Sequence, residues 1–180
     1  MTESQSLNIA VVGAGPGGYA AAFLAADLGM TVTLIDPEVN PGGVCLYRGC
    51  IPSKALLHVA KLLEESHQAK DWGIEFAAPK IDLARLRSWK EGIVKKLTGG
   101  LGLLAKQRKV TFIQGKAGFE NSNTLIVTKG DGSTQSLTFD RIILATGSRP
   151  SIVPALKLDT PRMMDSTDRK STRLNSSHSS

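Results

Sequence analysis

The chain has 180 residues, 41% of them hydrophobic, and a net charge of +6, which fits one globular domain with a substantial core. The basic residues between Lys80 and Lys109 follow a helical pattern with few aromatic neighbours, so they indicate a solvated helix face rather than a nucleic-acid surface. No apolar run reaches the roughly 18 residues that a membrane span needs, and the polar start is not typical of a signal peptide. We therefore expect a cytoplasmic protein with no nucleic-acid or membrane partner.

The first elements in chain order are a strand, a glycine-rich turn, a helix and a second strand. Residues 7–12 form a short run rich in Val and Ile, as in a buried parallel strand. An Ala-rich helix is predicted from about Gly17 to Leu28, where Gly29 ends it, and residues 31–35 form the second strand. We expect the turn to contact a dinucleotide through Gly13, Gly15, Pro16, Gly17 and Gly18.

Each glycine of this turn has a physical task in a dinucleotide site. Gly13 allows the tight turn, Gly15 lets the backbone approach a pyrophosphate, and Gly18 lets the helix pack closely on the strand. The helix N-terminus faces the phosphates, and Asp36, eighteen residues after Gly18, can accept hydrogen bonds from ribose hydroxyls. The order of strand, glycines, helix, strand and acid predicts a dinucleotide site, but it does not decide between FAD and NAD.

Both cysteines of the chain, Cys45 and Cys50, lie in the next stretch, residues 42–54. On a regular helix their Cα atoms would be roughly 8–9 Å apart, beyond the about 7 Å that a disulfide allows. Gly49 permits unusual backbone angles, and Pro52 cannot donate a backbone hydrogen bond, so the chain can bend before a helix that starts at about Pro52. Such a bend would allow a disulfide.

The chemistry of the cysteine pair stays open on residue types alone. A helix from about Pro52 to Glu65 would point its N-terminus at Cys50, and Lys54 would add a positive charge, which together favour a thiolate. Two reduced and inert cysteines in a cytosolic core are an alternative. A zinc site is another alternative, but it needs two further ligands. The histidines of the chain are His58, His67 and His178.

Residues 43–54 resemble the redox-disulfide signature of the flavoprotein disulfide reductases, and within that family they are most similar to the branch that oxidises dihydrolipoamide. Val44, Tyr47 and Arg48 stand where Thr, Asn and Val are commoner in that branch. The family also has Glu more often than Asp at the position of Asp36. These departures leave both cysteines and the lysine of the signature in place.

The resemblance implies a mechanism and a set of cofactor contacts. Dihydrolipoamide would attack a redox-active disulfide between Cys45 and Cys50, with Cys45 forming the mixed disulfide and Cys50 lying against the flavin as the charge-transfer thiolate. Electrons would pass through FAD to NAD⁺, so that lipoamide and NADH are formed. Further cofactor contacts are implied for Gly43, Lys54, Ala117, Thr146 and Gly147.

In this family the N-terminal βαβ unit binds FAD. An NAD domain comes later in the chain, followed by a dimerisation domain with a His–Glu pair that acts as general base. The implied partners are a lipoyl-bearing protein of a 2-oxoacid dehydrogenase or glycine cleavage complex, and a second copy of the enzyme in a homodimer. The alternatives are a glutathione or mercuric reductase-like enzyme and a non-catalytic FAD-binding fragment. The cysteine stretch argues against a plain NAD-binding module.

The rest of the chain is predicted to be scaffold and further sheet. The two histidines His58 and His67 are expected on a helix surface, and a loop with a short strand follows at Trp72–Ile74. Residues 81–104 show a helical period that is broken at Gly99–Gly100. Strands are predicted at 110–114, 125–128, 136–139 and 141–145, the middle two as a hairpin.

Two turns resemble later flavin contacts of the family. Thr146–Gly147 closes the last buried strand and resembles the second flavin motif, although an ordinary strand-to-loop turn is the alternative. Ala117 follows the strand 110–114, where the backbone of family members meets the adenine.

These elements predict an α/β fold: a Rossmann-like FAD-binding domain over residues 1–167, with a parallel sheet and a small antiparallel β-meander. Residues 168–180 continue no hydrophobic period, and codons that encode them resemble a sequencing adapter, so we expect them to be read-through. The domain would then be truncated, without the NAD and dimerisation domains. We expect the chain alone to be inactive, and poorly soluble or weak in binding FAD because a sheet edge is left unpaired.

Overall fold

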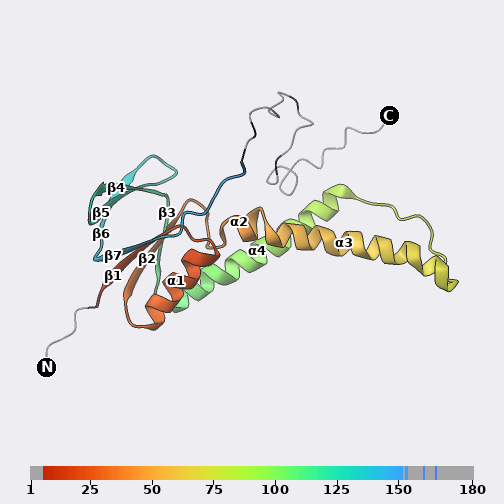
Figure 1. Cartoon of the computed structure of the whole chain (residues 1–180), viewed down its shortest axis with the longest axis horizontal. Coiled ribbons are helices and arrows are strands. Elements are labelled where there is room, and N and C mark those ends of the chain that lie inside the picture. The colour runs from red at the N-terminus through yellow and green to blue at the C-terminus, as the bar shows by residue number, and fades with distance from the viewer. Residues whose placement is uncertain (1–5, 152, 154–159, 161–164, 166–180) are drawn as a thin grey trace. The chain divides into compact units, whose positions relative to one another are not determined.

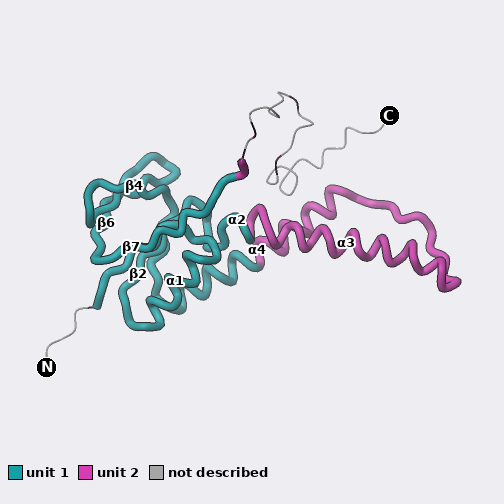
Figure 2. Tube along the Cα trace, in the orientation of Figure 1, with its two compact units in different colours: residues 1–45, 97–149 teal, residues 46–96, 150–180 magenta. Residues whose placement is uncertain are grey.

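The computed structural model describes residues 6–151, 153, 160 and 165. The chain forms two compact units, each of them made of two segments (Figure 2). The first unit consists of Met1–Cys45 and Leu97–Arg149, and the second of Leu46–Lys96 and Pro150–Ser180. The predicted domain end at Thr167 and the run 168–180 lie outside the described residues.

The first unit is built on a four-stranded parallel sheet in the order β3-β2-β1-β7 (Figure 1). Its strands are β1 (Asn8–Val12), β2 (Thr31–Asp36), β3 (Thr111–Gln114) and β7 (Arg141–Leu144). Each lies within one residue of a predicted buried strand, so the predicted α/β class is confirmed. Because β1 lies between β2 and β7, the direction in which the sheet is wound reverses at β1, and ligands of such sheets bind at this reversal.

Helices cover one face of this sheet (Figure 1). α1 (Pro16–Asp27) and the C-terminal part of α4 (Leu83–Gln107) contribute Ala22 and Ala105 to a buried cluster that also holds Val11 of β1. Successive side chains of a strand point to opposite faces, so the neighbours of Val11 face away from these helices.

A three-stranded antiparallel meander covers the other face, where Val127 packs in a second cluster with Ala10 of β1. Its strands are β4 (Lys116–Asn121), β5 (Thr124–Thr128) and β6 (Thr134–Thr138). The last two strands match the predicted hairpin to within two residues at each end. β4 was not predicted as a strand, because most of its side chains are exposed and it has no clear alternation of apolar residues.

The second unit holds α3 (Cys50–Gln68), the short 3₁₀ helix η1 (Ala69–Trp72) and the part of α4 up to Lys96. Residues 73–82 form no strand, so the short strand predicted at Trp72–Ile74 is wrong. The reason is that the N–H of Ile74 donates to the carbonyl of Ala69 at 3.0 Å and closes the end of η1.

α4 runs without interruption through Gly99 and Gly100, so the predicted break of the helical period at these residues is wrong. A glycine inside a helix costs about 1 kcal/mol relative to alanine. A helix of 25 residues that contributes to the core can absorb this cost. In the part of the chain that the structure describes, we find no helix with both the length and the apolar content to cross a membrane.

Candidate functional site

Three segments meet at the carboxyl ends of neighbouring strands of the first unit: the turn 13–15 after β1, Asp36 at the end of β2, and residues 145–147 after β7. α1 begins at Pro16 with Gly15 as its N-cap, and no side chain caps it. Its first turn also lacks an acidic residue. This helix end therefore keeps the N–H donors and the partial positive charge that bind anions such as phosphate.

Gly13 and Gly18 are held too close to other backbone for any side chain. A Cβ on Gly13 would collide with the carbonyl oxygen of Ala145, and the φ of Gly13 is 97°, in the left-handed region. A Cβ on Gly18 would collide with the carbonyl oxygen of Gly13. The structure thus has the tight turn and the close contact between helix and turn for which these glycines were singled out.

Gly43 brings the segment after β2 back against the glycine turn. Its φ is 57°, and a Cβ on it would collide with the Cα of Gly15. The N–H of Gly42 donates to the carbonyl of Ala14 at 2.8 Å. Two backbone segments without side chains therefore lie in contact beside the N-terminus of α1. Sequence reasoning gave Ala14 and Gly42 no role of their own, because they act here through backbone N–H and C=O groups, which do not depend on the side chain.

Asp36 lies at the expected strand end and is 7% exposed. Its Oδ2 accepts the N–H of Ala14 at 2.7 Å, and its Oδ1 accepts the N–H of Glu38 at 2.9 Å. The carbonyl of Asp36 accepts the N–H of Gly115 at 2.9 Å, which brings the start of β4, with Ala117, to the same end of β2. Both oxygens of the predicted ribose acceptor are therefore bound to backbone donors.

The predicted second flavin motif directly follows β7. The N–H of Ala145 donates to the carbonyl of Val12 at 2.8 Å, so the ladder between β7 and β1 extends to this residue. Thr146 and Gly147 are exposed, and Gly147 has a φ of 70°. The structure therefore brings the glycine turn, Asp36 and the motif after β7 to one edge of the sheet.

The two cysteines lie in separate helices, Cys45 in α2 (Gly43–Tyr47) and Cys50 as the first residue of α3. The predicted bend between them is confirmed, because α2 ends before Gly49, which has φ −123° and ψ −108°. Cys50 is exposed and Cys45 partly buried, and the structure holds them as two thiols rather than as a disulfide. Their redox pairing stays a prediction.

α3 begins two residues earlier than predicted, at Cys50 rather than at Pro52. Ser53 donates to the carbonyl of Gly49 through its N–H at 3.2 Å and through its Oγ at 2.8 Å, and these bonds close the first turn. Proline is tolerated there because the amides of a first turn have no partner inside the helix. No acidic residue lies in this turn to offset the partial positive charge of the helix end at Cys50.

The other polar residues singled out on α3 are exposed: Lys54, His58 and His67. The exposure of the two histidines is as expected for side chains on a helix surface. Within the described ranges, no three side chains of His, Cys, Asp or Glu gather into a group that could hold a metal ion.

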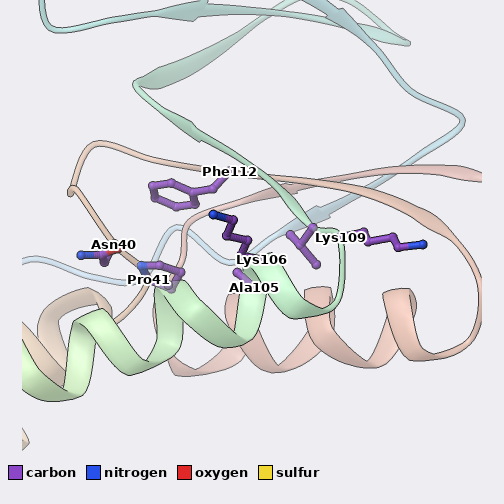
Figure 3. A pocket seen from close by; sticks show the side chains of 8 residues that line it. Asn40, Pro41, Ala105, Lys106, Lys109 and Phe112 are labelled. Atoms are coloured by element: carbon purple, nitrogen blue, oxygen red, sulfur yellow. The ribbon is translucent and has the colours of Figure 1, made fainter.

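The first unit also has a cavity of about 360 Å³ that contains none of the predicted site residues (Figure 3). Figure 3 shows the side chain of Lys106 extending from α4 towards the ring of Phe112 in β3, and Asn40 and Pro41 of the loop after β2 also line the cavity. A Cβ on Gly102 would collide with Oδ1 of Asn40, so the missing side chain of Gly102 makes room for this residue. Sequence reasoning gave no signal for this cavity, because two segments far apart in the sequence, 40–41 and 102–112, line it.

A Rossmann-type glycine turn at the winding reversal of a parallel sheet, followed by two closely spaced cysteines, defines the class of this protein. The chain belongs to the pyridine nucleotide-disulphide oxidoreductase family, whose model matches residues 7–177.

Among curated proteins, the chain is similar to several named dihydrolipoyl dehydrogenase. It is 48% identical over 168 residues to that of Haemophilus influenzae and 47% identical over 168 residues to that of Vibrio cholerae. Each match covers 93% of this chain and 35% of the relative, so the chain spans about a third of the length of these relatives. Among solved structures, LpdA of Mycobacterium tuberculosis matches with a TM-score of 0.75 and 27% identity, covering 85% of this chain and 34% of LpdA.

Proposed function

We propose that this chain is the FAD-binding part of a dihydrolipoyl dehydrogenase, with Cys45 and Cys50 as its redox-active pair. One observation carries the proposal: in a chain that belongs to this family, an anion-binding helix end lies at the winding reversal of the sheet, and a second helix starts at an exposed cysteine soon after. The names of the relatives support the choice of dihydrolipoamide as substrate.

The residues of the site fit FAD. The pyrophosphate would lie at the N-terminus of α1, where Gly15 and Gly43 leave bare backbone on which a side chain would stand in the way. Ala117 would meet the adenine, and Thr146 and Gly147 would pass beneath the flavin. Bound FAD supplies a carrier for two electrons between the cysteine pair and NAD⁺.

The cysteines perform two thiol exchanges in this proposal. A substrate thiolate attacks Sγ of Cys45 in the Cys45–Cys50 disulfide, so a mixed disulfide forms and Cys50 leaves as a thiolate. The second substrate thiolate then attacks the substrate sulfur of the mixed disulfide and releases Cys45 as a thiolate, with lipoamide as product. Cys45 and Cys50 are then both reduced, and their disulfide would form again once the electron acceptor that bound FAD would supply takes the two electrons.

The N-terminus of α3 stabilises the thiolate that leaves in the first step, because Cys50 is the first residue of the helix and no acidic side chain lies in its first turn. Lys54 lies one turn further along α3 and adds a positive charge near the flavin. We also propose that the whole enzyme acts in the cytoplasm as a homodimer. Its macromolecular partner is a lipoyl-bearing protein of a 2-oxoacid dehydrogenase or glycine cleavage complex.

A chimera tests this function. Residues 1–167 replace the matching third of the dihydrolipoyl dehydrogenase of Haemophilus influenzae, and the chimera is assayed for bound flavin and for reduction of NAD⁺ by dihydrolipoamide. We expect an active flavoprotein, and we expect Cys45→Ser and Cys50→Ser each to lower activity by roughly 1000-fold or more while flavin stays bound. The proposal is contradicted if the flavin-loaded chimera instead reduces glutathione disulfide or mercuric ion. It is also contradicted if the Cys50→Ser variant of the chimera keeps its activity.

A further inference from the structure

The cavity of the first unit is lined by the end of α4, the start of β3 and the loop after β2 (Figure 3). Its deepest wall is apolar: Pro41 is fully buried, Ala105 is 2% exposed and Val110 is 6% exposed. The half-buried ring of Phe112 adds a flat apolar surface. With a volume of about 360 Å³, the cavity has the size and the lining of a site for a small molecule.

One cation lies beside this apolar wall without a partner. The side chain of Lys106 extends from α4 towards the ring of Phe112 (Figure 3). Within the part of the chain that the structure describes, the ammonium of Lys106 forms no ion pair, hydrogen bond or ring contact. A ligand that brings a negative charge to this place would therefore form a charge-assisted hydrogen bond without breaking an existing one.

A left-handed turn at Lys109 leads from α4 into β3. Among the described residues other than glycine, only Lys109 has a positive φ, of 58°. Its N–H donates to the carbonyl of Lys106 at 3.0 Å. The N–H of Val110 donates to the carbonyl of Ala105 at 3.0 Å, so the helix ends in the motif that usually has glycine at the left-handed position. Backbone hydrogen bonds thus hold the corner at which α4 and β3 meet, with Lys106 on one side of the cavity and Phe112 on the other.

The space on the side of the β2 loop depends on Gly102. A Cβ on Gly102 would collide with Oδ1 of Asn40, and both residues line the cavity. Position 102 lies on α4, one turn before Lys106. A large side chain at position 102 would therefore enter the cavity, so a substitution there can block it while Lys106 and Phe112 stay in place.

We propose that this cavity binds a small carboxylate with an apolar ring. The ring packs against Phe112 and the buried wall, and the carboxylate pairs with the ammonium of Lys106. The class of ligand follows from the lining, because the apolar wall favours a flat and uncharged body and one ammonium balances one negative charge. The inference goes beyond the proposed function and does not rest on it, since no residue of the cavity belongs to the proposed FAD or cysteine sites.

The probe is 2-naphthoate, and its binding to the 180-residue chain is measured by calorimetry with and without ADP. We expect a Kd of roughly 0.3 mM, as the size of the probe allows. The neutral 2-naphthamide should bind about fivefold more weakly, because it has no charge to pair with the ammonium. ADP, which we expect at the start of α1, should leave the affinity for 2-naphthoate unchanged. In amide NMR spectra, the largest shifts on adding 2-naphthoate should be those of Gly102 and Val110.

Three variants locate the carboxylate, and melting curves establish that each of them is folded. Lys106→Gln should weaken 2-naphthoate about fivefold and leave 2-naphthamide unchanged. Lys109→Gln is the matched control, because it removes the same charge from a side chain that extends away from Phe112 (Figure 3). Its affinity for 2-naphthoate should stay within about twofold of the wild type, since solvent and salt screen an exposed charge that makes no contact. Gly102→Leu should abolish the binding of both probes.

Three results would each overturn the proposal. The first is a wild-type chain that shows no saturable binding of 2-naphthoate. The second is an equal loss of affinity in Lys106→Gln and Lys109→Gln, which would mean that net charge and not contact attracts the probe. The third is displacement of 2-naphthoate by ADP, which would place the probe at the start of α1.

Discussion

α1 in the first unit and α3 in the second start in the same way, but we propose different chemistry for each. Each follows a glycine N-cap, Gly15 or Gly49, and neither has a side-chain cap or an acidic residue in its first turn. The start of α1 is packed against other backbone, as the close contact of Gly18 with Gly13 shows. The first residue of each helix is exposed, Pro16 in α1 and Cys50 in α3, but only Cys50 has a reactive side chain.

This contrast teaches that the groups around a positive helix end, rather than its exposure, decide what it can do. Both ends offer N–H donors and partial positive charge. In the proposed function, the close-packed glycine backbone at the first would leave room for a phosphate, whereas the exposed sulfur at the second would take part in thiol exchange. Four predictions test the first unit and the start of α3, from the largest expected effect to the smallest.

The largest effect is expected where the start of α1 is packed most tightly. Gly18→Ala should lower the free energy of unfolding by about 3 kcal/mol, because its Cβ would collide with the carbonyl oxygen of Gly13, and it should abolish flavin binding. Gly17→Ala is the control, since a Cβ at Gly17 has nothing within 4 Å, and it should be neutral or stabilising by up to about 1 kcal/mol. Urea unfolding measures the stability of both variants. Equal losses in Gly18→Ala and Gly17→Ala would show that the close contact of Gly18 with Gly13 is not what makes the start of α1 sensitive.

The start of α3 should show its exposure as reactivity. In the reduced chain we expect Cys50 to react with iodoacetamide about ten times faster than Cys45, because it is exposed and lies at a helix N-terminus. Mass spectrometry of timed samples of Cys45→Ser and Cys50→Ser measures each thiol separately. A faster reaction at Cys45 would contradict the assignment of Cys50 as the more accessible thiol.

The contact between Arg108 and α1 should contribute less to the stability of the first unit than the packing of Gly18 does. Arg108 at the end of α4 contacts Asp27 of α1, Nε to Oδ1, at 3.1 Å, and its guanidinium lies 5.1 Å from the centre of the Phe23 ring. Arg108→Ala should cost about 1 kcal/mol in thermal unfolding, because the ion pair is partly exposed and the ring contact adds a share. Arg108→Lys, which keeps the charge but loses the planar group, should recover less than half of it. Full recovery of stability in Arg108→Lys would mean that only the positive charge of residue 108, and not its planar group, stabilises this contact.

The smallest effect is expected in the exposed turn between β5 and β6. The hydroxyl of Ser133 at 2.7 Å and its N–H at 2.9 Å donate to Oδ1 of Asp131, and they hold the pKa of this carboxyl below its ordinary value. Because the pKa is lower in the folded chain, the stabilisation is complete above the ordinary carboxyl pKa and is lost as the pH falls through the folded value. Ser133→Ala should raise the pKa of Asp131 towards normal in a carbon NMR titration. An unchanged pKa of Asp131 would show that the hydrogen bond from the N–H of Ser133 lowers this pKa by itself.

The sheet of the first unit could be predicted because its signals are local. Buried parallel strands are short apolar runs, so residues 7–12 and 141–145 were placed to within one residue of β1 and β7. The glycine turn was found because only glycine fits there, as Gly13 shows by its φ of 97°. The bend before Cys50 was found from Gly49 and Pro52 for the same kind of reason.

Errors arose where a local signal was weak or tertiary contacts outweighed it. β4 is a strand because it pairs with β5, although its own side chains are mostly exposed. Gly99 and Gly100 lie inside α4 because the core contacts of this helix, such as that of Ala105, outweigh the cost of two glycines. Neither the pairing nor the packing can be read from the residues themselves.

Asp36 shows the division most clearly. The sequence by itself determined that an acidic residue ends the second strand of a dinucleotide-binding unit, because strand period, turn and spacing are properties of the nearby chain. Only the tertiary structure decided which groups this acid contacts, because the N–H of Ala14 lies 22 positions away and reaches Asp36 through the parallel pairing of β1 with β2. Hydrogen bonds between distant segments depend on register and burial, and these are fixed when the whole sheet forms.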